Sequence, residues 1–213
     1  PPPAAAQVQF GNWGNLTPFA IGDASQFRSG RTDFFHLNGR TYTDDYNEVK
    51  DHGSAAVRGA APDSYESQVA RYMPAGGGNP NAVARAVAAT RSLDLWDNAR
   101  LFALVNMAVN DSLIVTFALK YRHNFWRPYT AIRWADDGNP DTAPDPAFTT
   151  YIPTPPYPDY PCGLPSTIGS AAQVLRDVFG TDELPYSLTA AGINRSYTHL
   201  TQLEAESVDA RVF

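Results

Sequence analysis

Two cationic side chains and a glycine turn are the residues of this sequence best suited to chemistry. Six residues separate Lys120 from Arg127-Pro128, and Pro161-Cys162-Gly163 follows later, just before a predicted helix. A lysine supplies a point charge, an arginine supplies a rigid fork of donors that suits tetrahedral oxyanions, and a glycine lets backbone N–H groups approach a ligand closely. The spacing therefore predicts an anion site, and phosphate and vanadate both fit it.

The surroundings of these residues resemble the vanadium-dependent haloperoxidases and the type-2 phosphatidic acid phosphatases, which share one fold. That superfamily carries Lys-x6-Arg-Pro, then Pro-Ser-Gly-His, then Ser-Arg-x5-His. The stretch from Lys120 to Arg133 resembles the first motif, the stretch from Thr154 to Gly163 resembles the approach to the second, and Ala210-Arg211-Val212-Phe213 resembles the start of the third. The resemblance implies an oxyanion pocket formed by Lys120, Arg127, Cys162, Gly163 and Arg211.

The sequence departs from the family pattern at the residues that, in the family, transfer protons and that bind vanadium or attack phosphorus. Cys162 stands where the family has a serine that binds the oxyanion, and Leu164 stands where it has the histidine that acts as general acid and base. The sequence given ends at Phe213, with three residues still missing before the histidine of the third motif. None of the four histidines (His36, His52, His123 and His199) follows Arg211.

These departures leave two classes of function open. A leucine cannot transfer a proton, and general acid–base catalysis typically contributes about 10² to 10⁴ in rate. Under the first reading the chain is an enzyme of the family, a vanadate- and peroxide-dependent halide oxidase or a phosphomonoesterase, whose catalysis is impaired at Leu164. Under the second it is a non-catalytic protein that binds a phosphate-like anion, or that kept only the scaffold for interaction or storage. The cofactor is then vanadate, another oxyanion, or none, and no zinc-binding motif is present.

Composition excludes several other classes of protein. The chain has 213 residues, 43% of them hydrophobic, which predicts one globular domain. Its net charge of −6 and the absence of a basic run argue against nucleic-acid binding. Its one cysteine excludes an internal disulfide. The start, Pro-Pro-Pro-Ala-Ala-Ala, favours a processed N-terminus and hence a soluble secreted or periplasmic protein.

The pattern of caps and apolar residues predicts an all-α helical bundle, with an irregular arm at 1–42 and a helical domain at 43–213. A tight hairpin turn is predicted at 37–40, and Gly76-Gly77-Gly78 is predicted to be a flexible joint. We expect helices capped by Thr43, by Asp63, by Asn79 and by Asp94, and a further helix from Pro165 to Phe179 that Gly180 ends.

The longest predicted helix runs from Asp94 to about Arg122. Polar residues interrupt its apolar stretch, so we expect a buried helix of a soluble protein without a membrane span. Asn106, Asn110 and Lys120 share one face of it. The two asparagines are interpreted either as a polar wall of the anion pocket or as buried amides that bond to neighbouring helices.

Nine prolines between Asn139 and Pro165 predict a rigid extended arm that delivers Cys162 and Gly163 to the start of a helix. The Cys162 thiol is interpreted either as a reactive group with a lowered pKa or as a small buried hydrophobe. The family's C-terminal helices are missing from this sequence, so we expect an apolar face that a second copy or a cleaved C-terminal segment covers.

Overall fold

The computed structural model describes residues 9–27, 35–134 and 136–213. The expected processed N-terminus at 1–6 lies outside these ranges. The elements within them are, in chain order, η1 (Trp13–Asn15), η2 (Ala24–Phe27), α1 (Arg40–His52), α2 (Ala55–Ala60), α3 (Tyr65–Tyr72), η4 (Met73–Gly77, a short π-helix), α4 (Pro80–Ala88), α5 (Leu95–His123), α6 (Pro128–Arg133), α7 (Gly163–Phe179), β1 (Glu183–Ala190), β2 (Ile193–His199) and α8 (Leu200–Asp209).

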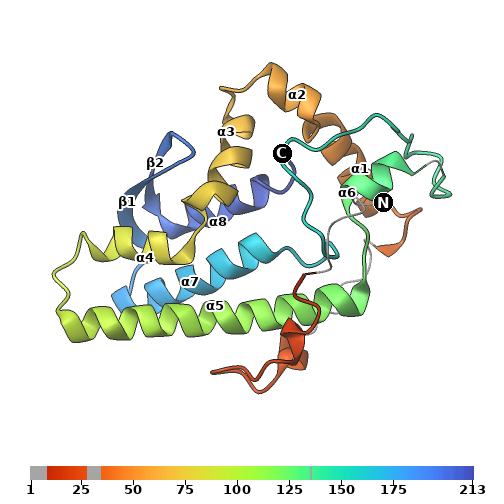
Figure 1. Cartoon of the computed structure of the whole chain (residues 1–213). Helices are drawn as coiled ribbons and strands as arrows, with labels where there is room; N and C mark the ends of the chain where they lie inside the picture. The colour runs from red at the N-terminus through yellow and green to blue at the C-terminus, as the bar shows by residue number, and fades with distance from the viewer. Residues whose placement is uncertain (1–8, 28–34, 135) are drawn as a thin grey trace.

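Helix α5 is the longest element and runs along one side of the molecule, with α7 lying beside it (Figure 1). On the far side of α7 lie α4, α8 and the β1–β2 hairpin, and together these elements enclose the larger apolar core. A smaller core forms where α1 packs against α6, around Tyr42, Tyr46 and Ile132. The junction between α5 and α6, which follows Lys120 and contains Arg127, packs against the smaller core through Phe125 and Trp126.

The sequence predicts α5 correctly because both of its ends carry strong signals. The Asp94 carboxylate accepts a hydrogen bond from the Asp97 backbone N–H at 2.8 Å, and Asn124 ends the helix in the left-handed conformation at φ 48°. The segment Leu95–Arg133 is long and apolar enough to span a bilayer by length and composition alone, a test that the core helix of a soluble protein also passes. Asp111 and Lys120 are nonetheless buried against protein groups, as in the core helix of a soluble protein.

The N-terminal segment packs directly on α5. Gly14 allows this approach, because a Cβ at this position would lie 2.6 Å from the Ala118 Cα atom. Further along, the buried Asp111 carboxylate accepts hydrogen bonds from the backbone N–H groups of Phe19, Ala20 and Ile21, two of them at 2.7 Å. The described part of the predicted arm is therefore an ordered layer on the central helix.

The two-stranded sheet corrects the expectation of a purely α-helical domain. β1 pairs antiparallel with β2, and Ala191 and Gly192 at the turn both have positive φ, at 51° and 73°. Those angles match the tight hairpin turns that suit the twist of the strands. Ala-Gly is a weaker turn signal than Asn-Gly, which explains why the sequence did not reveal the hairpin.

Several local expectations were wrong by a few residues or in kind. Residues 37–39 form a turn that leads straight into α1 at Arg40, so there is no hairpin there, and Thr43 lies inside the helix. Ser64, not Asp63, caps α3. The glycine run at 76–78 is a packed turn and no flexible joint, since Gly77 lies against the Tyr72 ring.

Candidate functional site

Lys120 occupies the last turn of α5 and is almost completely buried, with 1% of its surface exposed. Its ammonium donates hydrogen bonds to the backbone carbonyls of Pro158, at 2.9 Å, and Asp159. It also lies 5.3 Å from the centre of the Tyr157 ring, within the range of a cation–π contact. The proline-rich arm therefore supplies the partners that a buried ammonium requires.

Arg127 is the residue before α6 and is also buried. Its Nε donates to the Tyr157 carbonyl and its Nη1 to an Asp159 carboxylate oxygen, each at 2.8 Å. Its Nη2 is buried and has no hydrogen-bond partner among the described residues. An unpaired donor on a buried cation is costly, so this atom is the clearest place for an additional acceptor.

Cys162, Gly163 and Leu164 form the start of α7. The helix begins at Gly163, two residues earlier than predicted, and the Cys162 side chain makes no capping hydrogen bond. Burial raises the pKa of the Cys162 thiol, although Arg211 acts in the opposite direction. The raised pKa of this half-buried thiol favours the interpretation as a small hydrophobe over that as a reactive group with a lowered pKa.

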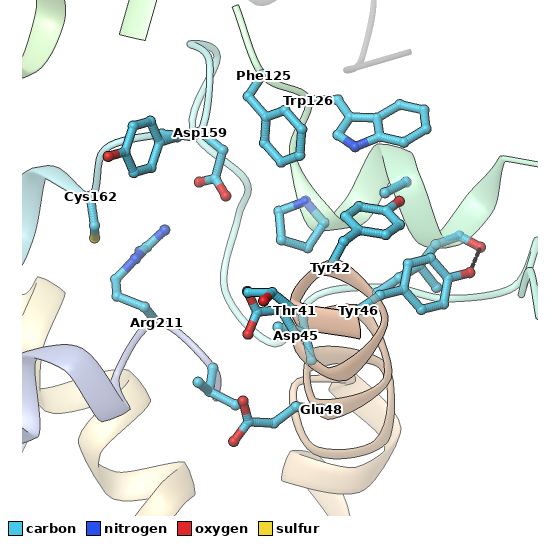
Figure 2. A pocket seen from close by; sticks show the side chains of 16 residues that line it. Thr41, Tyr42, Asp45, Tyr46, Glu48, Phe125, Trp126, Asp159, Cys162 and Arg211 are labelled. Carbon is cyan, nitrogen blue, oxygen red and sulfur yellow. Dashed lines mark hydrogen bonds between the residues drawn. The ribbon is translucent and has the colours of Figure 1, made fainter. Parts of the chain in front are cut away.

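Arg211 follows α8 and reaches the same region from the other side of α7. Its guanidinium points toward the Cys162 thiol and the Asp159 carboxylate (Figure 2). No carboxylate within the described ranges forms an ion pair with it. Lys120, Arg127 and Arg211 all line one cavity, as their predicted convergence requires.

That cavity has a volume of about 460 Å³ and will be called the cation cavity. All the residues that the motifs identified line it, namely Lys120, Arg127, Cys162, Gly163, Leu164 and Arg211. A neighbouring cavity of about 560 Å³, between α1 and α6, shares Cys162 and Arg211 with it (Figure 2). Both volumes are in the range of small-molecule sites.

The electrostatics of the cation cavity favour an anion. Burial, reinforced by the nearby Arg127 charge, lowers the pKa of Lys120 from 10.5 to about 8, and Asp159 only partly opposes this. Burial lowers the pKa of Arg127 as well. Each shift means that the charged form is less favourable here than in water. A bound anion would reverse that penalty.

Two residues that contact the cations were not identified from the sequence. Asp159 pairs with Arg127, and the Tyr157 ring lies beside both cations. Both belong to the proline-rich arm, whose predicted role was to deliver Cys162 and Gly163 to the start of a helix. The two asparagines of α5 do not line the cation cavity. Asn106 is exposed and exchanges hydrogen bonds with Asn81 on α4, so the interpretation as a polar wall was wrong for it.

Comparison with known protein families assigns the second half of the chain to a family. A family model described as the VCPO second helical-bundle domain matches residues 100–212, which is more than half of the chain. The vanadium chloroperoxidase of Curvularia inaequalis is 42% identical over 89 residues, which cover 38% of this chain and 14% of that protein.

Solved structures share the fold. A structure described as the first bacterial vanadium-dependent iodoperoxidase superposes with a TM-score of 0.84 at 23% identity, over 100% of this chain and 53% of that one. A holo-type bacterial vanadium-dependent chloroperoxidase superposes with a TM-score of 0.74 at 20% identity, over 95% of this chain and 48% of that one. The chain thus spans about half the length of these two structures.

Proposed function

This chain belongs to the vanadium haloperoxidase superfamily, and we propose that it is an oxyanion-binding domain of that superfamily which takes vanadate or phosphate in the cation cavity. We further propose that catalysis is impaired, because Leu164 replaces the residue that would transfer protons. The single observation that carries the proposal is that Arg127, whose buried Nη2 has no partner among the described residues, lines the same cavity as Lys120 and Arg211.

The residues present fit a tetrahedral oxyanion. Lys120 and Arg211 supply charge, and Arg127 supplies a donor that no described residue satisfies. The N-terminus of α7 adds backbone N–H groups at Gly163 and the positive end of a helix 17 residues long. The Cys162 thiol is at most a weak donor, unlike the hydroxyl that the family pattern has in its place.

Vanadate, when bound, is the group that would activate hydrogen peroxide for halide oxidation. The chain's own residues would hold the anion, balance its charge and exclude water from one side of it. Leu164 can neither accept a proton from an incoming group nor give one to a leaving group. The arrangement therefore supports binding more strongly than it supports turnover.

Thermal unfolding in low salt tests the proposal, with sulfate, phosphate and orthovanadate added separately. A ligand that binds only the folded state adds about 2.7 kcal/mol at a hundred times its Kd, so Tm should rise with anion concentration. Arg211→Met should abolish the rise. Arg100→Met removes an exposed arginine from the opposite end of α5 and should leave it unchanged. A wild-type Tm that millimolar anion does not move would overturn the proposal.

A further inference from the structure

A continuous aromatic wall adjoins the cations of the cation cavity. Phe10, Trp13, Phe117 and Tyr157 all line this cavity. The Phe10 ring lies 4.7 Å from that of Phe117 and 5.2 Å from that of Trp13, and the Phe117 ring lies 5.3 Å from that of Tyr157. We call these four residues the aromatic wall. An inorganic oxyanion alone needs no such surface.

Tyr157 joins the wall to the cations. The Arg127 guanidinium lies 4.8 Å from the centre of the Tyr157 ring, and the Lys120 ammonium lies 5.3 Å from it. The same ring also lies beside the rings of Phe117 and, at 6.1 Å, Phe10. A ligand whose charged group meets Arg127 would therefore bring any attached ring directly onto the aromatic wall.

A second unpaired donor lies in the wall itself. The Trp13 Nε1 is buried and has no hydrogen-bond partner within the described ranges, just as the Arg127 Nη2 has none. Buried N–H groups usually have a partner, and here the two residues that carry unpaired ones, Trp13 and Arg127, line the same cavity. Their placement favours a ligand that carries acceptors at both ends of an apolar body.

From these contacts we propose that the cation cavity binds an aromatic oxyanion, with its charged group at Arg127 and its ring against the aromatic wall. The class comprises aryl phosphonates, aryl sulfonates and aryl carboxylates, and an acceptor on the far side of the ring would meet Trp13. This inference rests on the proposed oxyanion site, and it adds that the ligand bound there carries an aromatic ring attached to its charged group. The N-terminal segment thereby acquires a role in specificity, because it contributes two of the four rings.

Calorimetric titration of the whole chain with phenylphosphonate and methylphosphonate tests this directly. The two probes share the charged group and differ in the ring, so a ring buried on the wall should give phenylphosphonate about tenfold higher affinity. Trp13→Ala should reduce that ratio to about threefold or less. Trp96→Ala removes a tryptophan that is 80% exposed, and it should preserve the ratio.

The outcomes separate this inference from the proposed function. If inorganic phosphate and both phosphonates fail to bind, the oxyanion site itself is wrong and the inference falls with it. If phosphate and methylphosphonate bind but the phenyl group adds nothing, or if Trp13→Ala keeps the full ratio, only the aromatic inference is overturned.

A measurement on the wild-type chain covers the case in which Trp13→Ala does not fold. The indole N–H signal of Trp13 in a ¹H–¹⁵N spectrum, assigned with Trp13→Phe, should shift with phenylphosphonate and stay in place with methylphosphonate. The Trp96 signal should not move with either probe. Equal shifts of Trp13 with both probes would contradict the proposal.

Discussion

The Nη1 atom of Arg127 lies 2.8 Å from an Asp159 carboxylate oxygen, so the arginine best placed to hold an anion already faces one from its own chain. Lys120 is bound to the same stretch through the carbonyls of Pro158 and Asp159. The carboxylate of the arm therefore offsets part of the positive charge, and an external anion must compete with this carboxylate, whose side chain is 29% exposed.

Asp159→Asn should raise the affinity for sulfate or phosphate. The substitution removes a negative charge near the bound anion but keeps an oxygen that can accept from Arg127. Charges a few ångströms apart near a protein surface interact by a few kcal/mol, and water reduces this, so we expect about a tenfold gain. Calorimetric titration of both proteins measures it, with Asp145→Asn, elsewhere on the arm, as the control. Unchanged or weaker binding in Asp159→Asn would show that this carboxylate does not face the ligand.

The buried Lys120 should make stability depend on pH in a defined window. Its pKa is about 8 in the folded protein and 10.5 ordinarily, so between these values the unfolded chain binds more protons than the folded chain. The free energy of unfolding therefore rises with pH across this window, because the folded state has already released a proton that it holds unfavourably.

Lys120→Met is the reference protein for this measurement. The difference between the two proteins cancels the pH dependence of stability that comes from all other titratable groups. Urea unfolding at about pH 7.5 and about pH 9.5 should show the wild type gaining about 2 kcal/mol relative to the variant. A wild type whose stability changes with pH in parallel with Lys120→Met would show that the lysine is not destabilised by burial.

The sequence motifs identify residues that line the cation cavity, but they do not identify the residues that surround the cations. Lys120, Arg127, Gly163 and Arg211 could be found because each occupies a motif position, and helix signals place three of them at the ends of α5, α6 and α7. Their convergence depends on the long-range packing of α5, α7 and α8, which no local pattern specifies. The motif order predicted it by resemblance alone.

Asp159 and the aromatic wall could not be predicted, for a physical reason. The partners of the cations come from a proline-rich arm with no periodicity, so the direction of each side chain is not encoded by helix or strand spacing. The contact of Phe10 with Phe117 joins residues more than a hundred positions apart and depends on Gly14 lying against α5. The sequence shows a glycine at position 14, but it does not show that this glycine packs against Ala118.

Gly14→Ala should lift the N-terminal segment from α5. The new methyl group would lie 2.6 Å from the Ala118 Cα and 2.7 Å from its Cβ, so the backbone must shift, at a cost of about 1–3 kcal/mol. Gly11→Ala is the matched control in the same segment, since nothing lies within 4 Å of a Cβ there. Thermal unfolding and proteolysis of the segment compare the two. Equal stability of both variants would mean that the segment is not held against the helix.

Leu164 provides the last prediction, because it occupies the cavity position where the family pattern has a proton-transferring histidine. The chain as given should show no vanadate-dependent bromide oxidation and no phosphate release above the protein-free rate, since an alkyl side chain cannot take part in proton transfer. Leu164→His should place a titrating imidazole beside the bound anion. Sulfate affinity should then increase as the pH falls through about 6.5, because the imidazole gains a charge there while sulfate keeps its own. Leu95→His, at a position 80% exposed at the far end of α5, should leave the pH dependence of the wild type unchanged. Turnover by the wild-type chain would show that catalysis does not need a proton-transferring side chain at position 164. A Leu164→His variant whose sulfate affinity does not change with pH would show that this position does not face the anion.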